Sequence, residues 1–199
     1  MLKTKQSGFT LVETLVAITI LLLVIVGPMT ISSNAAKSTT YSSDQVIAFF
    51  LAQEGAELVQ AYRDDYFLEY LDDVISGASS PIDPWDEFRN SGNALGTCFG
   101  ASGCGLELQT SGFGTVVNCG SSSCRLYLDT NTVTKRSRYT HQNPTNTYEQ
   151  TPYTRTIRIE QIPGQEEVRV ISTVTWRSGN LLNEQSARVE TYLLNTYGN

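Results

Sequence analysis

The apolar residues of the chain are concentrated in one long run near the N-terminus. Residues 9–31 carry a single charge, at Glu13, whereas the preceding residues 1–8 are short, mostly polar and contain Lys3 and Lys5. As a helix that rises about 1.5 Å per residue, the run is long enough to cross the roughly 30 Å core of a bilayer. Lysines placed only before it predict a cytoplasmic segment 1–8 and a non-cytoplasmic remainder.

Gly27-Pro28 interrupts this run near its end. Proline removes a backbone donor and clashes with the preceding turn, so the pair predicts a kink, or else the end of the membrane segment. Both alternatives remain open at this point.

Residues 32–71 are expected to form the second, amphipathic half of a long helix. Residues 32–43 are small and polar, and apolar residues then recur at helical spacing from about Asp44 to Leu71. The apolar stripe comprises Ile47, Leu51, Leu58 and Tyr62, widened by Phe50 and Ala61. Such a helix would pack its apolar side on a sheet.

Residues 72–199 are expected to form a β-rich globular head. Residues 72–97 indicate an acidic loop with short helical turns, and residues 130–154 an exposed loop. Short strands are predicted at Leu106–Leu108 and Cys124–Leu128, which could pair as a small hairpin. Three antiparallel strands are predicted after residue 156, with turns at Pro163-Gly164 and Ser178–Asn180. The predicted fold class is α+β, a long N-terminal helix packed on a C-terminal antiparallel sheet.

Charge and cysteine content narrow the function classes. A formal net charge of -6 argues against binding nucleic acid directly, and the short basic run 135–138 is expected to be a solvated loop. An even cysteine count in an exported domain favours disulfides. Four cysteines allow three connectivities, of which local pairing within Cys98/Cys104 and Cys119/Cys124 is preferred. A zinc site is the competitor, but the usual CxxC spacing is absent.

No catalytic, metal or cofactor site is predicted. His141 is the sole histidine and is expected in a polar loop, and no nucleophile elbow, phosphate loop or His-Glu-x-x-His motif is present. Calcium binding by the acidic loop is an alternative to simple solvation, although EF-hand spacing is absent. Its candidate ligands are Asp72, Asp73, Asp83, Asp86 and Glu87.

Glu13 is the residue that simple anchoring does not explain. A carboxylate in a membrane segment costs about 2.5–3.5 kcal/mol on insertion scales, so such a residue is normally paired or functional, unless it lies near enough to the interface to stay hydrated. A secretory signal does not fit either, because its cleavage site follows the apolar core.

The segment Gly8-Phe9-Thr10-Leu11-Val12-Glu13 closely resembles the processing site of type IV prepilins and type II secretion pseudopilins. The resemblance implies that a prepilin peptidase cuts between Gly8 and Phe9 and methylates Phe9. It also implies that Glu13 meets the charged amino terminus of a neighbouring subunit.

Two parts of the chain are similar to minor pilins and minor pseudopilins. These are residues 48–64 and the three C-terminal strands, of which the middle strand contains Val174-Thr175-Trp176. The resemblance implies a structural minor subunit of a type IV pilus or secretion pseudopilus, not an enzyme. Its partners would be the peptidase, other pilins, the inner-membrane assembly platform and the membrane. The precursor would sit in the cytoplasmic membrane with its head outside the cytoplasm, and then enter a periplasmic or extracellular filament. An alternative is a filament-tip adhesin that uses residues 98–124, and a third hypothesis is an anchored exported enzyme.

Overall fold

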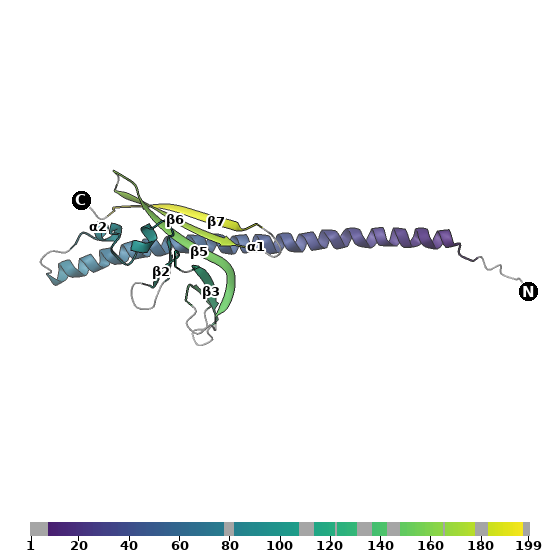
Figure 1. The fold of residues 1–199 in the computed structure, drawn as a ribbon, viewed down its shortest axis with the longest axis horizontal. Coiled ribbons are helices and arrows are strands. Elements are labelled where there is room, and N and C mark those ends of the chain that lie inside the picture. Colours follow the sequence, from purple (N-terminus) through teal and green to yellow (C-terminus); the bar gives the residue numbers. More distant parts are fainter. Residues whose placement is uncertain are drawn as a thin grey trace, which may run out of the picture. The chain divides into compact units, whose positions relative to one another are not determined.

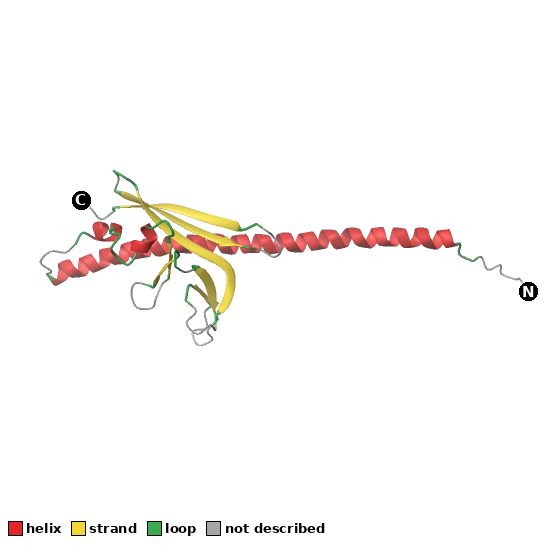
Figure 2. Cartoon of the chain, in the orientation of Figure 1, coloured by secondary structure: helices red, strands yellow, loops and turns green. Residues whose placement is uncertain are grey.

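The structure is a computed structural model that describes residues 8–77, 82–107, 114–121, 123–130, 137–142, 148–164, 166–177 and 183–196. A long helix is followed by a mainly antiparallel β domain (Figures 1 and 2), so the α+β prediction is confirmed. The chain divides into two compact units, residues 1–43 and residues 44–199. Both clusters of buried apolar residues described below belong to the second unit.

Helix α1 extends over Leu11–Ser76 without a break in its helical assignment. It passes through Gly27 and Pro28, so the proline does not end the helix, and it runs on past Leu71. The small polar stretch 32–43 is also helical. Its hydroxyls bond back to carbonyls one turn earlier, as Thr39 Oγ1 does to the Ala35 carbonyl at 3.0 Å and Ser42 Oγ to the Ser38 carbonyl at 2.9 Å.

The buried face of α1 lies entirely between residues 48 and 66. Leu51, Leu58 and Tyr62 are buried, as their spacing predicts. Phe50 was expected on this face, but it is 62% exposed, because it lies nearly opposite the buried side at 100° per residue. Small residues complete the contact instead. The buried residues that the periodicity missed are Ala48, Ala52, Gly55, Ala56, Val59 and Tyr66.

The connection after α1 forms two short helices, α2 at Pro84–Arg89 and the 3₁₀ helix η1 at Gly96–Phe99. Asp83 caps α2, since its carboxylate accepts from the amides of Trp85 at 2.9 Å and Asp86 at 3.1 Å. This cap turns Trp85 and Phe88 into the core, where both are buried.

The sheet has seven strands with the long strand β5 at its centre. On one side β5 pairs with both β1 and β3, which in turn pair with β2 and β4; on the other side it pairs with β6, and β6 with β7. All these pairings are antiparallel. The strands are β1 Cys104–Leu106, β2 Val116–Asn118, β3 Arg125–Asp129, β4 Arg138–Thr140, β5 Glu149–Gln161, β6 Glu167–Trp176 and β7 Gln185–Leu194.

The three C-terminal strands match the predicted meander. Val168, Val170, Val174 and Trp176 are all buried on one parity of β6, and β5 and β6 are joined by the turn at Pro163-Gly164. The side of β7 that carries Ala187, Val189 and Leu193 is the less exposed one, as its alternation indicates.

Two expectations for the middle of the chain were wrong. The strands that follow the two cysteine pairs do not form a hairpin with each other, because β1 pairs with β2 and β3 with β4. The segment 130–154 is not all exposed loop, since it contains β4 and the first part of β5, where Thr151 and Tyr153 are buried. Leu108, Lys135-Arg136, Ser80-Pro81 and the predicted turn 178–180 lie outside the described residues.

Arg155 ties α1 to the sheet from inside the core. Its side chain is 1% exposed, and its guanidinium donates to the Leu106 carbonyl at 2.8 Å, the Leu51 carbonyl at 3.3 Å and the Glu54 carboxylate at 2.8 Å. These acceptors for Nη1 and Nη2 offset the cost of burying the charge, although the buried Nε has no hydrogen-bond partner among the described residues. Arg155 thus joins β5 and β1 to residues 44–76 of α1, the head portion of this helix.

Candidate functional site

The junction predicted as a processing site lies just before the first turn of α1. Gly8, Phe9 and Thr10 are exposed and have no regular secondary structure, and α1 begins at Leu11. An accessible segment outside the helix would let a peptidase reach the bond between Gly8 and Phe9. The preceding residues 1–7, with Lys3 and Lys5, lie outside the described part of the chain.

Packing within the chain does not explain the glycine at position 8. A Cβ atom added to Gly8 would meet nothing within 4 Å. Substitution at this position therefore leaves the fold unstrained, so that any effect on processing would report recognition by another protein.

Thr10 positions the first turn, a role that the sequence reasoning missed although its signal was present. The Glu13 amide lies 3.3 Å from Thr10 Oγ1 and 3.1 Å from the Thr10 carbonyl. Thr10-Leu11-Val12-Glu13 is therefore an S/T-x-x-E helix start, in which the hydroxyl offers the Glu13 amide a second acceptor beside the Thr10 carbonyl.

The carboxylate of Glu13 is left available by this arrangement. In a full capping box it would return to the Thr10 amide, but within the described part of the chain no donor reaches it. It lies in the first turn of α1, where the helix dipole favours a negative charge. A role in capping thus accounts for Thr10 and leaves Glu13 unexplained.

Glu13 lies at the start of an exposed and mainly apolar section of α1. Among the described residues, α1 is the one helix long and apolar enough to span a membrane, and its apolar section is not buried within the chain. Its threonine hydroxyls are satisfied locally, as Thr14 Oγ1 donates to the Leu11 carbonyl at 2.9 Å and Thr19 Oγ1 to the Val16 carbonyl at 2.8 Å. The exposed apolar side chains include Phe9, Leu11, Val12, Leu15, Ile18, Leu22, Ile25 and Ile31.

The four cysteines of the head form two local disulfides, Cys98–Cys104 and Cys119–Cys124. Cys98 and Cys104 are fully buried and join η1 to the start of β1. The second disulfide closes the connection between β2 and β3. The two disulfide loops lie close together, because a Cβ on Gly120 would be 3.0 Å from Ser102 Oγ.

The carboxylates considered for calcium are distributed over two helices. Asp72 and Asp73 lie near the end of α1, Asp83 caps α2, and Asp86 pairs with Arg89 at 2.8 Å. Glu87 lines a hollow of about 200 Å³ with Glu69 and Asp73. Within the described ranges, no group of three or more potential ligands is arranged to hold a metal ion.

His141 does not lie in a solvated loop, contrary to expectation. It is 9% exposed, its ring packs against Gly105, and its amide donates to the Glu107 carboxylate. Burial, together with the charge of Arg155, lowers the pKa of His141 to about 4. Glu107 also accepts from Thr140 Oγ1 at 2.8 Å and the Gln142 amide at 3.1 Å, so these residues form a structural polar cluster.

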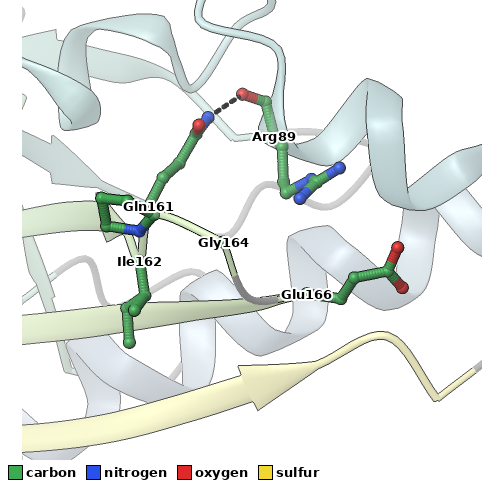
Figure 3. Close-up of a pocket in the computed structure, with 6 residues that line it drawn as sticks. Arg89, Gln161, Ile162, Gly164 and Glu166 are labelled. Carbon is green, nitrogen blue, oxygen red and sulfur yellow. Dashed lines mark hydrogen bonds between the residues drawn. The ribbon is translucent and has the colours of Figure 1, made fainter.

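An open hollow of about 630 Å³ lies between the end of α2 and the β5–β6 turn (Figure 3). The Gln161 amide donates to the Arg89 carbonyl across it at 2.6 Å, and Glu166 lies on its far side. Arg89 is already paired with Asp86 and stacks 5.8 Å from the centre of the Trp85 ring. The described residues that line the hollow are both polar and apolar: Arg89, Gln161 and Glu166 on the one hand, Ile162 and Pro163 on the other.

The N-terminal part of the chain matches a known sequence family. Residues 3–27 match the family model of the prokaryotic N-terminal methylation motif. No curated protein and no solved structure matches the chain. The matched residues contain the Gly8–Phe9 junction, Glu13 and most of the apolar section of α1. The chain therefore carries the prepilin-type N-terminal methylation motif, the signature of type IV pilins and pseudopilins.

Proposed function

We propose that this protein is a structural minor subunit of a type IV pilus or a type II secretion pseudopilus. A prepilin peptidase would cut the precursor between Gly8 and Phe9 and methylate the new terminus. Residues 9–31 would hold the chain in the cytoplasmic membrane, with the head outside the cytoplasm, until an inner-membrane assembly platform moves it into a filament with other pilins. In this role the chain carries out no reaction of its own.

The observation that carries the proposal is Glu13. It is the one charged residue between Phe9 and Ile31, it lies one turn after the matched junction, and no described donor reaches its carboxylate. An unpaired carboxylate is costly among acyl chains. A positively charged amino terminus on a neighbouring subunit would relieve that cost, so assembly in register would be favoured over the isolated subunit in lipid.

The head supports the same role through its architecture. Its two cores consist of apolar side chains from α1, α2 and the sheet, and its buried polar groups hold these elements together. Such a domain suits a stable filament surface.

The test is Glu13→Ala in cells that make the chain with its assembly system. We expect unchanged membrane insertion, because the apolar section is intact, and a roughly ten-fold or larger loss of the subunit from sheared filaments, the effect of leaving a neighbour's charged terminus unpaired. Thr19→Ala is the matched control, since its hydroxyl bonds only within α1. Normal incorporation of Glu13→Ala would refute the pairing, and loss of Thr19→Ala to the same degree would make the effect nonspecific.

A further inference from the structure

The two disulfides of the head differ in their exposure to solvent. Cys98 and Cys104 are both 0% exposed and belong to the larger buried cluster, together with the two aromatic residues of α2. A thiolate does not reach their sulfur atoms unless that cluster opens. Cys124 is buried as well, but Cys119 is half-buried at the residue after β2. Cys119 is therefore the cysteine of the head that lies closest to solvent.

The loop between Cys119 and Cys124 is small and exposed. It reads Gly-Ser-Ser-Ser, so no side chain between the two cysteines is larger than serine. Gly120, Ser121 and Ser123, the described residues of this loop, are all exposed. Access to the attacked sulfur is one determinant of the rate of thiol–disulfide exchange, and here the loop offers little steric hindrance.

Cys124 has an unfavourable backbone conformation. Its φ is 45°, and among the described residues it is the one residue other than glycine with a positive φ. In this left-handed region the Cβ atom of an L-residue crowds the backbone, so that residues other than Gly, Asn and Asp rarely adopt it. The bond to Cys119 helps to hold Cys124 there. Cleavage of the disulfide would let this backbone relax, which favours the opened form.

Opening this disulfide does not require the head to unfold, because other contacts hold both of its ends. The Cys119 amide donates to the Gly103 carbonyl at 3.2 Å, and the Arg155 amide donates to the Cys124 carbonyl at 3.1 Å. The first bond fixes the end of β2 to the loop of the other disulfide, and the second fixes the start of β3 to β5. Neither bond involves a sulfur atom.

We propose that Cys119–Cys124 is a thiol–disulfide exchange site, which a dithiol opens by attack on Cys119. One thiolate of the dithiol forms a bond with Cys119 Sγ, the bond between the two cysteines breaks, and Cys124 leaves as a thiolate. The second thiolate of the dithiol then displaces Cys119. The dithiol is oxidised to a disulfide, the protein disulfide is reduced to two thiols, and the two protons that the dithiol loses are balanced by the two that the cysteines take up.

Exchange at this site is independent of filament assembly, so it adds a chemical property to the proposed function. The opened head carries an accessible thiol at Cys119 on an otherwise folded domain. Such a thiol either returns to Cys124 or forms a mixed disulfide with a thiol of a partner. The disulfide Cys98–Cys104 stays closed throughout, because the core covers it.

The test is reduction of the folded full chain in detergent with dithiothreitol at pH 7. Samples taken at intervals are quenched with acid, unfolded and alkylated with N-ethylmaleimide, and the thiols are mapped by mass spectrometry. We expect Cys119–Cys124 to open at least about ten-fold faster than Cys98–Cys104, while the fluorescence of the two tryptophans stays unchanged. In urea that unfolds the head, both disulfides should open at similar rates, because their sequence separations are 5 and 6 residues.

Two single variants identify the attacked sulfur. Cys124→Ala leaves Cys119 as a free thiol, and Cys119→Ala leaves Cys124 as one. In the folded chain, N-ethylmaleimide should modify Cys119 at least about ten-fold faster than Cys124, because Cys124 is buried. Equal rates, or faster modification of Cys124, would refute attack on Cys119.

Reduced thioredoxin at the same dithiol concentration serves as a second reductant. Faster opening than with dithiothreitol identifies a protein dithiol as the donor that the site accepts best, and slower opening identifies a small dithiol. Selective opening of Cys119–Cys124 by either reductant supports the site.

Three results with the folded chain would overturn the exchange site. These are resistance of Cys119–Cys124 to dithiothreitol, opening of both disulfides at one rate, and opening that occurs only as the tryptophan fluorescence reports unfolding. None of them bears on cleavage after Gly8 or on incorporation into filaments, so the exchange site and the proposed function fail separately.

Discussion

Glu107, His141 and Arg155 come from three separate parts of the chain and meet inside the head. Glu107 gathers the amides at the end of β4, the His141 ring fills the space over Gly105, and Arg155 bonds to the carbonyls of Leu51 and Leu106. Each polar group is placed by partners distant in sequence. The cluster therefore fixes the turn after β4 against β1 without any catalytic arrangement.

Acid should weaken the head through His141. Its pKa is about 4 in the fold and about 6.5 in an unfolded chain, so between these values the unfolded chain binds a proton that the folded chain does not. Stability is complete above about pH 6.5 and falls as the pH drops toward 4; at pH 4.5 we expect a loss of about 2 kcal/mol from this residue. Urea unfolding of the detergent-solubilised chain at pH 7 and pH 4.5 measures it.

His141→Gln provides the comparison, because glutamine does not titrate in this range. Its unfolding free energy should differ less between the two pH values than that of the wild type. An equal difference in both proteins would show that His141 is not the residue through which acid acts.

The surroundings of Glu107, His141 and Arg155 could not be predicted from local sequence patterns. His141 is surrounded by polar residues in the sequence, and its burial arises from β1 and Arg155, which no local pattern connects to it. The segment with Gly8, Phe9 and Glu13 could be predicted as a processing site, because the residues that identify it are contiguous in the sequence. Thr10 was equally accessible, since capping depends on residues three apart.

At the scale of helices and strands, Gly55 determines how closely α1 approaches the sheet. A Cβ at this position would lie 2.4 Å from Ser172 Oγ, 3.1 Å from Arg155 Cδ and 3.2 Å from Ile157 Cδ1. The backbone of α1 therefore rests directly on β5 and β6. The same closeness leaves the buried Ser172 hydroxyl without a hydrogen-bond partner among the described residues.

Gly55→Ala should lower the free energy of unfolding by about 1–2 kcal/mol, because overpacking outweighs the gain of about 1 kcal/mol in helix propensity. Ser172→Ala alone should be neutral or stabilising, since it removes an unsatisfied buried hydroxyl. The double variant should recover part of the loss. Urea unfolding of the four proteins tests this, and a Gly55→Ala protein at least as stable as the wild type would contradict the close contact.

The elements differ in how far their patterns predicted them. The alternation in β6 and β7 identified both strands, because one side of each is less exposed than the other. The first part of β5 was not predicted as a strand, because its sequence is polar and contains Pro152. Thr151 and Tyr153 are buried there by partners that are distant in the sequence. The burial of Gly55 and Ala56 was missed because small residues give a weak periodic signal.

At the scale of the molecule, the two compact units have opposite surface chemistry. The described residues of the first unit expose nearly all their apolar side chains, whereas the second unit buries most of its own in two clusters. Exposed apolar surface of that extent is stable only in lipid or against other subunits. The methylation motif at residues 3–27 is consistent with both environments in succession.

The most direct measurement is the intact mass and N-terminal sequence of the mature chain purified from its own cells. We predict a chain that starts at Phe9 and carries one methyl group on its amino nitrogen. Gly8→Ala, which meets no packing constraint in the chain, should accumulate as the uncut precursor. A wild-type chain that retains residues 1–8, or begins at any residue other than Phe9, would contradict processing between Gly8 and Phe9.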